Sequence, residues 1–137
     1  DFARRTVAVA DIDNEGFFLE ADVCKGLPLA DNFADFIISR GSIWFWEDKA
    51  KGLAEIYRVL KIGGTALIGG GFGRYVPDTM RARLSETRKN TLEKKGVKRL
   101  SLEEMEALAL EAGIPSFKVM HDAPGDKGRW IEIHKHV

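Results

Sequence analysis

Apolar residues recur along the chain with two spacings, and these spacings predict alternating strands and helices. Short runs rich in aromatic and β-branched residues, bounded by turn-forming residues, are typical of strands. The predicted strands are 17–21, 34–39, 65–70, 116–122 and 129–137. The last two flank the turn-rich connection 123–128, which indicates an antiparallel hairpin.

Other segments place apolar residues every three to four positions, and we predict helices there. The predicted helices are 48–61, 78–95 and 101–113, with 2–12 as the end of a further helix. Asp48 is the expected N-cap of the first of the three, and Gly63–Gly64 the expected end. Ser101 and Glu104 form a capping box. The alternation predicts an α/β fold, with a mostly parallel sheet and an antiparallel C-terminal hairpin.

The composition is that of an ordinary globular domain, with 45% apolar and 31% charged residues among 137. The 21 basic residues balance the 21 acidic ones, so net charge favours neither nucleic acid nor a membrane as partner. The single cysteine, Cys24, fits a reducing cytoplasm, where we expect the protein. Because the chain begins with Asp1 rather than Met, we expect a piece of a longer polypeptide.

Two groups of charged or titratable residues are candidate sites. Residues 81–99 hold eight bases against two acids. This favours a solvated helix face over the attraction of an anionic substrate. His121, His134 and His136 belong to the predicted hairpin, but no acid or cysteine completes a ligand set, so we predict no metal.

The stretch 65-TALIGGGFGRYVP-77 joins an apolar run to four glycines. A dinucleotide-binding turn would need a helix at once and an acid about 20 residues on, but Pro77 and Arg88 occupy those places. Alternatively, the glycines relax a crowded strand end. A third interpretation, which we favour, is that they leave room for a ligand at the carboxyl edge of the sheet.

An ordered set of motifs spans residues 21–70. In order they are Asp22 after an apolar strand, the loop 27-LPLADN-32, the strand 33-FADFIIS-39, the helix 55-EIYRVLK-61 with Gly63–Gly64, and the strand from Thr65 to Gly70. This set resembles the central part of the class I S-adenosylmethionine-dependent methyltransferases, the seven-stranded Rossmann-like family, and its methyltransferase type 11-like members. The pieces would be the acid after the family's third strand, its fourth strand, the next helix and its fifth strand.

The resemblance implies a three-layer fold with sheet order 3-2-1-4-5-7-6 and S-adenosyl-L-methionine as cofactor. The family's glycine-rich loop and ribose-binding acid follow its first two strands, which would precede Asp1. Residues 1–137 would then be a single, incomplete domain, the C-terminal two-thirds, lacking those strands. Without its usual neighbours, the strand 17–21 is expected to be displaced, frayed or paired with a second copy of the chain.

The resemblance also implies cofactor contacts. Asp22 would accept a hydrogen bond from the adenine amino group, and the Val23 N–H would meet the adenine ring. The alternative for Asp22 is an acid that caps a turn. Ser39 and Arg40 would border the transferable methyl group, with a turn hydroxyl and a surface charge as the alternatives.

The substrate side is expected just beyond the fourth strand. Gly41 would border the acceptor, and Trp44 and Trp46 could stack on a planar substrate. The alternative, which we favour, is that these rings anchor the following helix to the core.

Methyl transfer from a sulfonium is an in-line displacement with a neutral leaving group, so alignment is the main task of the protein. A general base is needed only when the acceptor must lose a proton, and we assign no catalytic side chain. We expect a small-molecule acceptor and an inactive isolated chain. The alternatives are a non-catalytic methyltransferase-like scaffold and a nicotinamide-dependent oxidoreductase using Gly69–Gly73.

Overall fold

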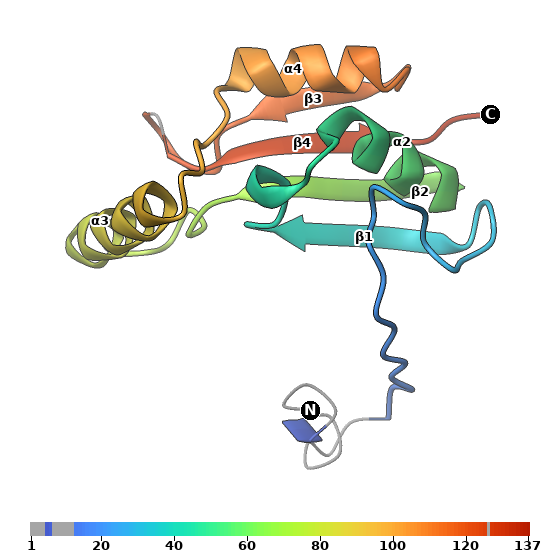
Figure 1. Ribbon diagram of the computed structural model, residues 1–137, viewed down its shortest axis with the longest axis horizontal. Coiled ribbons are helices and arrows are strands. Elements are labelled where there is room, and N and C mark those ends of the chain that lie inside the picture. Colours follow the sequence, from blue (N-terminus) through green and yellow to red (C-terminus); the bar gives the residue numbers. More distant parts are fainter. Residues whose placement is uncertain (1–4, 7–12, 126) are drawn as a thin grey trace.

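The structure, a computed structural model, describes residues 5–6, 13–125 and 127–137. Four strands and three α-helices, with one short 3-10 helix, make up the named elements of this part (Figure 1). They are β1 (Ala34–Arg40), η1 (Ile43–Phe45), α2 (Lys49–Val59), β2 (Leu60–Gly70), α3 (Asp78–Lys94), α4 (Leu102–Glu111), β3 (Phe117–Met120) and β4 (Arg129–His134). None of the helices described is long and apolar enough to cross a membrane.

The strands form one sheet in the order β1-β2-β4-β3. β1 and β2 are parallel, whereas β4 is antiparallel to both of its neighbours. This is the order 4-5-7-6 of the expected family sheet, so the predicted α/β class and the C-terminal hairpin are confirmed. Both β1 and β2 end at the same side of the sheet, which places their carboxyl ends together.

Two of the predicted helices, α2 and α4, are capped at their N-termini by side chains. The Asp48 side chain accepts a hydrogen bond from the Lys51 amide at 3.1 Å at the start of α2. The Ser101–Glu104 capping box is present at the start of α4, with both hydrogen bonds made. Each pair satisfies backbone N–H groups that have no partner within the helix.

The end of α2 differs from the prediction. The helix stops at Val59, and β2 begins at Leu60, so Gly63 and Gly64 lie inside the strand segment. Pairing with β1 is irregular there and becomes continuous from Thr65. A Cβ on Gly64 would lie 2.9 Å from the Asp35 carbonyl oxygen, so the close approach of β1 requires glycine.

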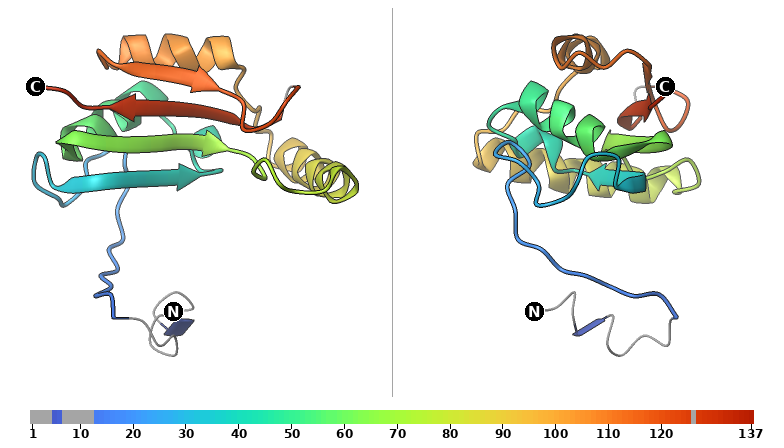
Figure 2. Two further views of the ribbon diagram at one scale, coloured as in Figure 1. Left: turned by 180° about the vertical axis from the view of Figure 1, so that it is seen from behind. Right: turned by 90° about the vertical axis from the view of Figure 1, so that its right-hand side faces the viewer.

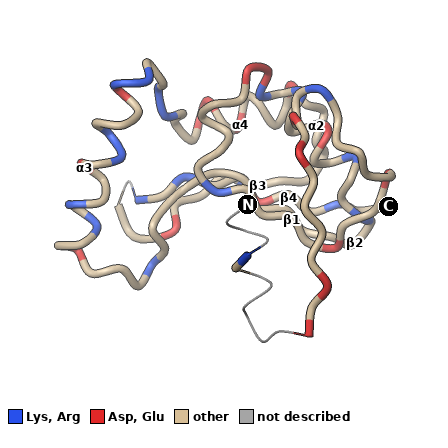
Figure 3. The backbone as a smooth tube through the Cα atoms, turned by 60° about the horizontal axis from the view of Figure 1, so that its bottom comes forward, with Lys and Arg blue, Asp and Glu red and all other residues tan. Residues whose placement is uncertain are grey.

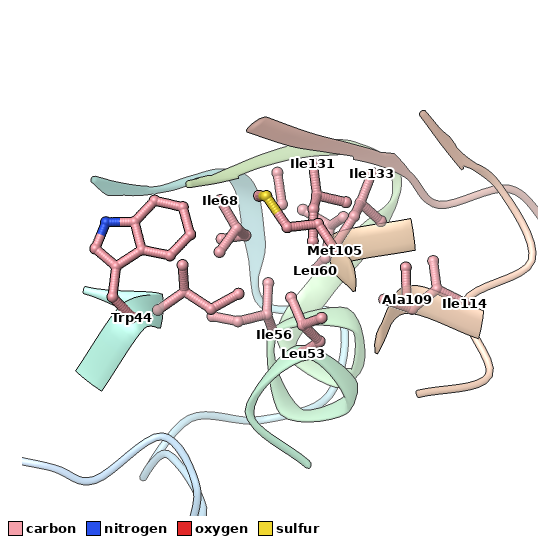
Figure 4. Packing of buried hydrophobic residues seen from close by; sticks show 12 residues of the cluster. Trp44, Leu53, Ile56, Leu60, Ile68, Met105, Ala109, Ile114, Ile131 and Ile133 are labelled. Atoms are coloured by element: carbon pink, nitrogen blue, oxygen red, sulfur yellow. The ribbon is translucent and has the colours of Figure 1, made fainter. Parts of the chain in front are cut away.

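The hydrophobic core lies between one face of the sheet and the helices α2 and α4 (Figure 4). From the sheet come Ala66, Ile68, Ile131 and Ile133, all fully buried. The facing residues of the helices are Leu53, Ile56, Met105 and Ala109. Alternate strand residues share a face, which is why Ala66 and Ile68 of β2, and Ile131 and Ile133 of β4, all belong to this core.

The opposite face of the sheet carries no helix within the described residues (Figure 2, left). Phe36 and Ile38 of β1 point to that side and keep 56% and 61% of their surface exposed. Strand β1 is also an edge of the sheet. Within the part of the chain that the structure describes, the sheet therefore buries apolar surface on one side.

The segment 17–21 does not form the predicted strand, which agrees with the expectation that it is displaced or frayed without its usual neighbours. Residues 13–20 have no regular secondary structure and extend away from the sheet (Figures 1 and 2). Phe17 and Leu19 are 83% and 63% exposed. A strand needs a neighbour to receive its backbone hydrogen bonds, and this segment lies beside none of the four strands. Pairing with a second copy stays a prediction, and most of the helix predicted at 2–12 lies outside the described residues.

One-sided burial predicts unequal costs for two isoleucines of the same sheet. Ile68→Ala removes a fully buried side chain and should cost about 2–5 kcal/mol of unfolding free energy. Ile38→Ala, on the open face, should cost less than about 1 kcal/mol. Urea denaturation followed by circular dichroism measures both, and equal losses would contradict a sheet buried on one face.

Candidate functional site

A network of charged side chains holds the loop of residues 22–32 against α2. Arg58 donates hydrogen bonds from Nη2 and Nε to the Glu55 carboxylate, at 2.6 and 2.9 Å. Its Nη1 donates to Asp31 Oδ1 at 2.6 Å, and its Nη2 to the Leu27 carbonyl at 3.2 Å. The Leu27 amide donates to Glu55 Oε1 at 2.6 Å. Two residues one turn apart on α2, Glu55 and Arg58, therefore clamp the loop at its middle and near its C-terminal end.

The clamp changes the protonation of its carboxylate. Hydrogen bonds from Arg58 and then from the Leu27 amide lower the pKa of Glu55 to about 2, while burial opposes them. The hydrogen bond to Glu55 raises the pKa of Arg58 above its ordinary value. Both groups are thus charged throughout the physiological range, and each stabilises the charged form of the other.

Asp22 opens a tight turn at the start of this loop. Its Oδ1 accepts a hydrogen bond from the Cys24 amide at 2.9 Å, and its carbonyl accepts from the Lys25 amide at 3.0 Å. Lys25 Nζ lies 3.9 Å from Oδ2, and the Asp22 side chain is 48% exposed. The turn-capping role predicted as an alternative is therefore present. It occupies Oδ1 and leaves Oδ2 at the surface, so it does not exclude a ligand.

The same loop forms one wall of a cavity of about 580 Å³. Asp22 and Val23 line it from the loop, and Ser39 lines it from the end of β1. Trp46 lines it from the segment before α2, with its Nε1 donating to Ser42 Oγ at 2.8 Å. The structure thus brings together four of the seven predicted site residues, at the carboxyl end of a parallel strand. Small ligands bind in cavities of this size and position.

The other three predicted residues lie next to the cavity but face elsewhere. Arg40 Nε donates to the Gly71 carbonyl at 2.9 Å. The Gly41 amide donates to the Gly69 carbonyl at 2.6 Å. Trp44 is only 4% exposed and packs in the core, which favours its predicted alternative role as an anchor. These contacts join the end of β1 to the end of β2.

The glycine run at the end of β2 makes room for the β3–β4 connection. A Cβ on Gly71 would overlap the Asp122 carboxylate, and one on Gly69 would overlap the Arg129 carbonyl oxygen. Asp122 Oδ2 accepts hydrogen bonds from the Gly73 amide at 3.1 Å and from Trp130 Nε1 at 3.3 Å. The glycines therefore relieve a crowded strand end, as one of the three interpretations held.

The dinucleotide interpretation of this run is not favoured by its geometry. Helix α3 begins only at Asp78, after the N-cap Pro77. The glycines thus do not open a helix, whose N-terminal amides would have to hold the pyrophosphate. In the part of the chain that the structure describes, no group of three or more His, Cys, Asp or Glu side chains could hold a metal ion.

Sequence reasoning missed the two residues that position the loop, Glu55 and Arg58. Their spacing of three on a predicted helix was a signal for an ion pair. The sequence held no signal for the loop backbone that they grip. Sequence reasoning also did not assign a role to Ser42, whose hydroxyl accepts a hydrogen bond from the Trp46 ring and so orients it.

The comparisons with known proteins agree with this geometry. A family model described as a methyltransferase domain matches residues 1–68. A solved structure from Methanococcus maripaludis, assigned as an S-adenosyl-L-methionine-dependent methyltransferase, is 38% identical and superimposes with a TM-score of 0.77. The match covers 98% of this chain and 61% of that one. These two matches support a class I S-adenosylmethionine-dependent methyltransferase.

Curated methyltransferases match over shorter stretches. The chloroplastic 2-methyl-6-phytyl-1,4-hydroquinone methyltransferase of Arabidopsis thaliana is 50% identical over 44 residues, which are 32% of this chain and 13% of the relative. An uncharacterized methyltransferase of Bacillus subtilis is 46% identical over 62 residues, 45% of this chain and 34% of the relative. The matched part of this chain thus spans about a third of the length of these curated relatives or less.

Removing the charge of Glu55 should loosen the loop. Glu55→Gln should lower the unfolding free energy at pH 7 by about 1–2 kcal/mol, allowing for partial solvent screening of the pair. Because the folded pKa lies below the unfolded one, this stabilisation is complete above about pH 4.5 and is lost as the pH falls through about 2. The two proteins should therefore converge in stability towards pH 2.

Urea denaturation at several pH values measures this difference, and hydrogen exchange of the Leu27 amide should become faster in the variant. Glu86→Gln, at an exposed position of α3, is the matched control and should change neither quantity. If the stability difference between the parent and Glu55→Gln persisted undiminished at pH 2, it would contradict the role of the Glu55–Arg58 pair in holding the loop.

Alanine substitutions at two glycines of the run should destabilise the protein for different reasons. Gly71→Ala forces a Cβ into the Asp122 carboxylate and should cost about 1–3 kcal/mol. Gly73→Ala meets no atom within 4 Å but has a φ of +81°, so only backbone strain of about 1 kcal/mol is expected. Adding Asp122→Ser should recover part of the Gly71→Ala loss and none of the Gly73→Ala loss in thermal unfolding. Equal recovery would contradict the crowding explanation.

Proposed function

We propose that this protein transfers the methyl group of S-adenosyl-L-methionine to a small-molecule acceptor, and that the adenine ring binds in the cavity beside Asp22. One observation carries the proposal. In a chain of the methyltransferase family, Asp22, Val23 and Ser39 line a single cavity at the carboxyl end of β1.

The chemistry of the loop suits adenine. Asp22 Oδ1 is used by its own turn, so Oδ2 accepts the hydrogen bond from the exocyclic amino group. The Val23 N–H donates to the neighbouring ring nitrogen. Phe45 and Trp46 add apolar and aromatic surface to the same cavity, on which a planar base packs well.

The reaction needs alignment more than acid–base chemistry. The sulfonium loses its positive charge as the methyl group moves, so the leaving group departs neutral without a protonated side chain. Holding acceptor and methyl group in line supplies several kcal/mol of the barrier. The hydrogen bonds that tie Arg40 and Gly41 to the glycine run keep the end of β1 in one place.

We propose further that these 137 residues alone bind the cofactor weakly and are inactive. They supply the adenine side of the site, while the glycine-rich loop expected for the methionine part has no match in the sequence. A non-catalytic scaffold remains the second candidate, and micromolar or tighter affinity of the isolated chain would contradict the proposed weakness. The hydroquinone methyltransferases match over too short a stretch to carry their acceptor to this chain.

Asp22→Asn tests the adenine contact without breaking the turn. One side-chain oxygen still accepts from the Cys24 amide, but an NH₂ group replaces the acceptor that faces adenine. Calorimetric titration with S-adenosylhomocysteine should show a loss of affinity of about tenfold or more, the worth of a hydrogen bond to a charged group. Asp35→Asn removes the same charge at the far end of β1, where Asp35 pairs with Lys61, and should change the affinity less than twofold. Equal affinity for both variants and the parent would contradict the proposal.

A further inference from the structure

A second cavity, also of about 580 Å³, lies between α3 and the segments that follow β2 and precede β4. It lies within the size range of small-molecule sites. Six of its lining residues are basic and one is acidic. The basic ones are Arg81, Arg88, Lys89, Lys98, Arg99 and Lys127. Figure 3 shows how Lys and Arg recur along α3 and the turn after it.

The lysines of this cavity are paired with acids that offset their charge. Lys89 lies 4.0 Å from Glu93, Lys98 lies 3.9 Å from Glu104, and Lys127 lies 3.1 Å from Asp78. All three pairs are at the surface, where such contacts contribute little. The excess of positive charge therefore comes from the arginines.

Arg81 of the cavity and the neighbouring Arg40 donate to backbone carbonyl groups, which orient a guanidinium without cancelling its charge. Arg81 is 8% exposed, and its Nη2 donates to the Gly73 carbonyl at 2.7 Å. Arg40 donates to the Gly71 carbonyl. Asp122 is the carboxylate nearest to Arg81, at 3.9 Å from Nη1, and the buried Arg81 Nε has no hydrogen-bond partner. The guanidinium groups of Arg81 and Arg40 are thus held in fixed positions near the carboxyl ends of β1 and β2.

Arg88 lines this cavity from α3. Burial, followed by repulsion from Arg129 and Arg40, lowers its pKa below the ordinary value, and Asp122 offsets only part of the effect. Its guanidinium lies 4.7 Å from the centre of the Phe72 ring. A partly buried cation next to other cations is stabilised when an anion enters, because the anion relieves both the repulsion and the loss of solvation.

The rest of the lining is apolar. Phe72, Leu92 and Val97 contribute to the wall of the cavity. Leu92 is, with Arg81, one of the two buried residues of α3. A ligand that fits this wall has an apolar body as well as an anionic group.

The two cavities lie on either side of the point where the ends of β1 and β2 are joined by hydrogen bonds. Ser39 lines the candidate cofactor cavity, and the next residue, Arg40, belongs to the cationic group. Trp44 packs against Gly70 on one side, and the Arg99 guanidinium lies 5.8 Å from its ring. The second cavity therefore lies at the same carboxyl edge of the sheet where the methyl group would be presented.

We propose that the cavity between α3 and the glycine run binds the methyl acceptor, and that this acceptor is a small molecule with a carboxylate or phosphate group on an apolar body. The assignment of the ligand as acceptor rests on the proposed function. The binding of an anion at Arg88 does not.

The experiment titrates the 137-residue chain with decanoate, decyl phosphate, neutral decanol and a short single-stranded RNA, all without cofactor, and follows ¹⁵N chemical shifts. Decanoate or decyl phosphate should bind at least about tenfold more tightly than decanol, and their relative affinity distinguishes the two anionic groups. Arg88→Met should reduce that affinity by about tenfold, and Arg88→Lys by less. Lys94→Met removes one charge from the same helix outside the cavity and should change the affinity less than twofold.

Equal binding of decanol and the anions, equal losses in Arg88→Met and Lys94→Met, or binding of the RNA alone would overturn the anion site. Addition of S-adenosylhomocysteine separates the two proposals. If decanoate binds and the cofactor product does not, the proposed function fails while the anion site stands. If the two compete for one site, the assignment as an acceptor cavity is overturned. Simultaneous binding, with decanoate affinity unchanged in Asp22→Asn, supports it.

Discussion

The hydrogen-bonded ion pairs of Arg58 fix the geometry on which the candidate cofactor site depends. The loop of residues 22–32 has no regular secondary structure of its own beyond its turns. Its position comes from Arg58 and Glu55, which contact the loop at Leu27 and Asp31. Helix α2 is in turn fixed to the sheet by buried apolar residues. The carboxylate of Asp22 is thus placed beside β1 by a helix that itself belongs to the core.

A second constraint organises the other side of the sheet edge. Asp122 reaches from the β3–β4 connection into the glycine run and accepts hydrogen bonds from the Gly73 amide and Trp130. Only glycine leaves room for it at position 71. The same carboxylate is the nearest counter-charge of Arg81, which connects α3 to this edge. The contacts of Arg58 thus fix the candidate cofactor cavity, which has acidic and aromatic residues in its lining. The contacts of Asp122 fix the edge beside the second cavity, whose lining is cationic and apolar.

Local signals predicted much of this fold. The caps Asp48 and Ser101 set the starts of α2 and α4, and the turn-rich connection set the hairpin. The residues of 17–21 alone predicted a strand, but a strand exists only with a neighbour that receives its hydrogen bonds, and the expected lack of neighbours predicted its displacement. The end of α2 was missed for a related reason: pairing of Leu60 with Ala34 takes the chain into the sheet before the glycines are reached. For the site, the sequence indicated Asp22 and Ser39. It could not indicate the partners of Gly71, because these are residues distant in sequence.

The most direct test of the account is a map of backbone amide chemical shifts of the chain at millimolar S-adenosylhomocysteine, a concentration at which weak binding is still visible. The account predicts that the largest shifts fall on Val23 and Cys24 in the loop and on Ser39 at the end of β1. Shifts confined to Gly69–Gly73, or no shift at any concentration, would contradict the placement of adenine beside Asp22.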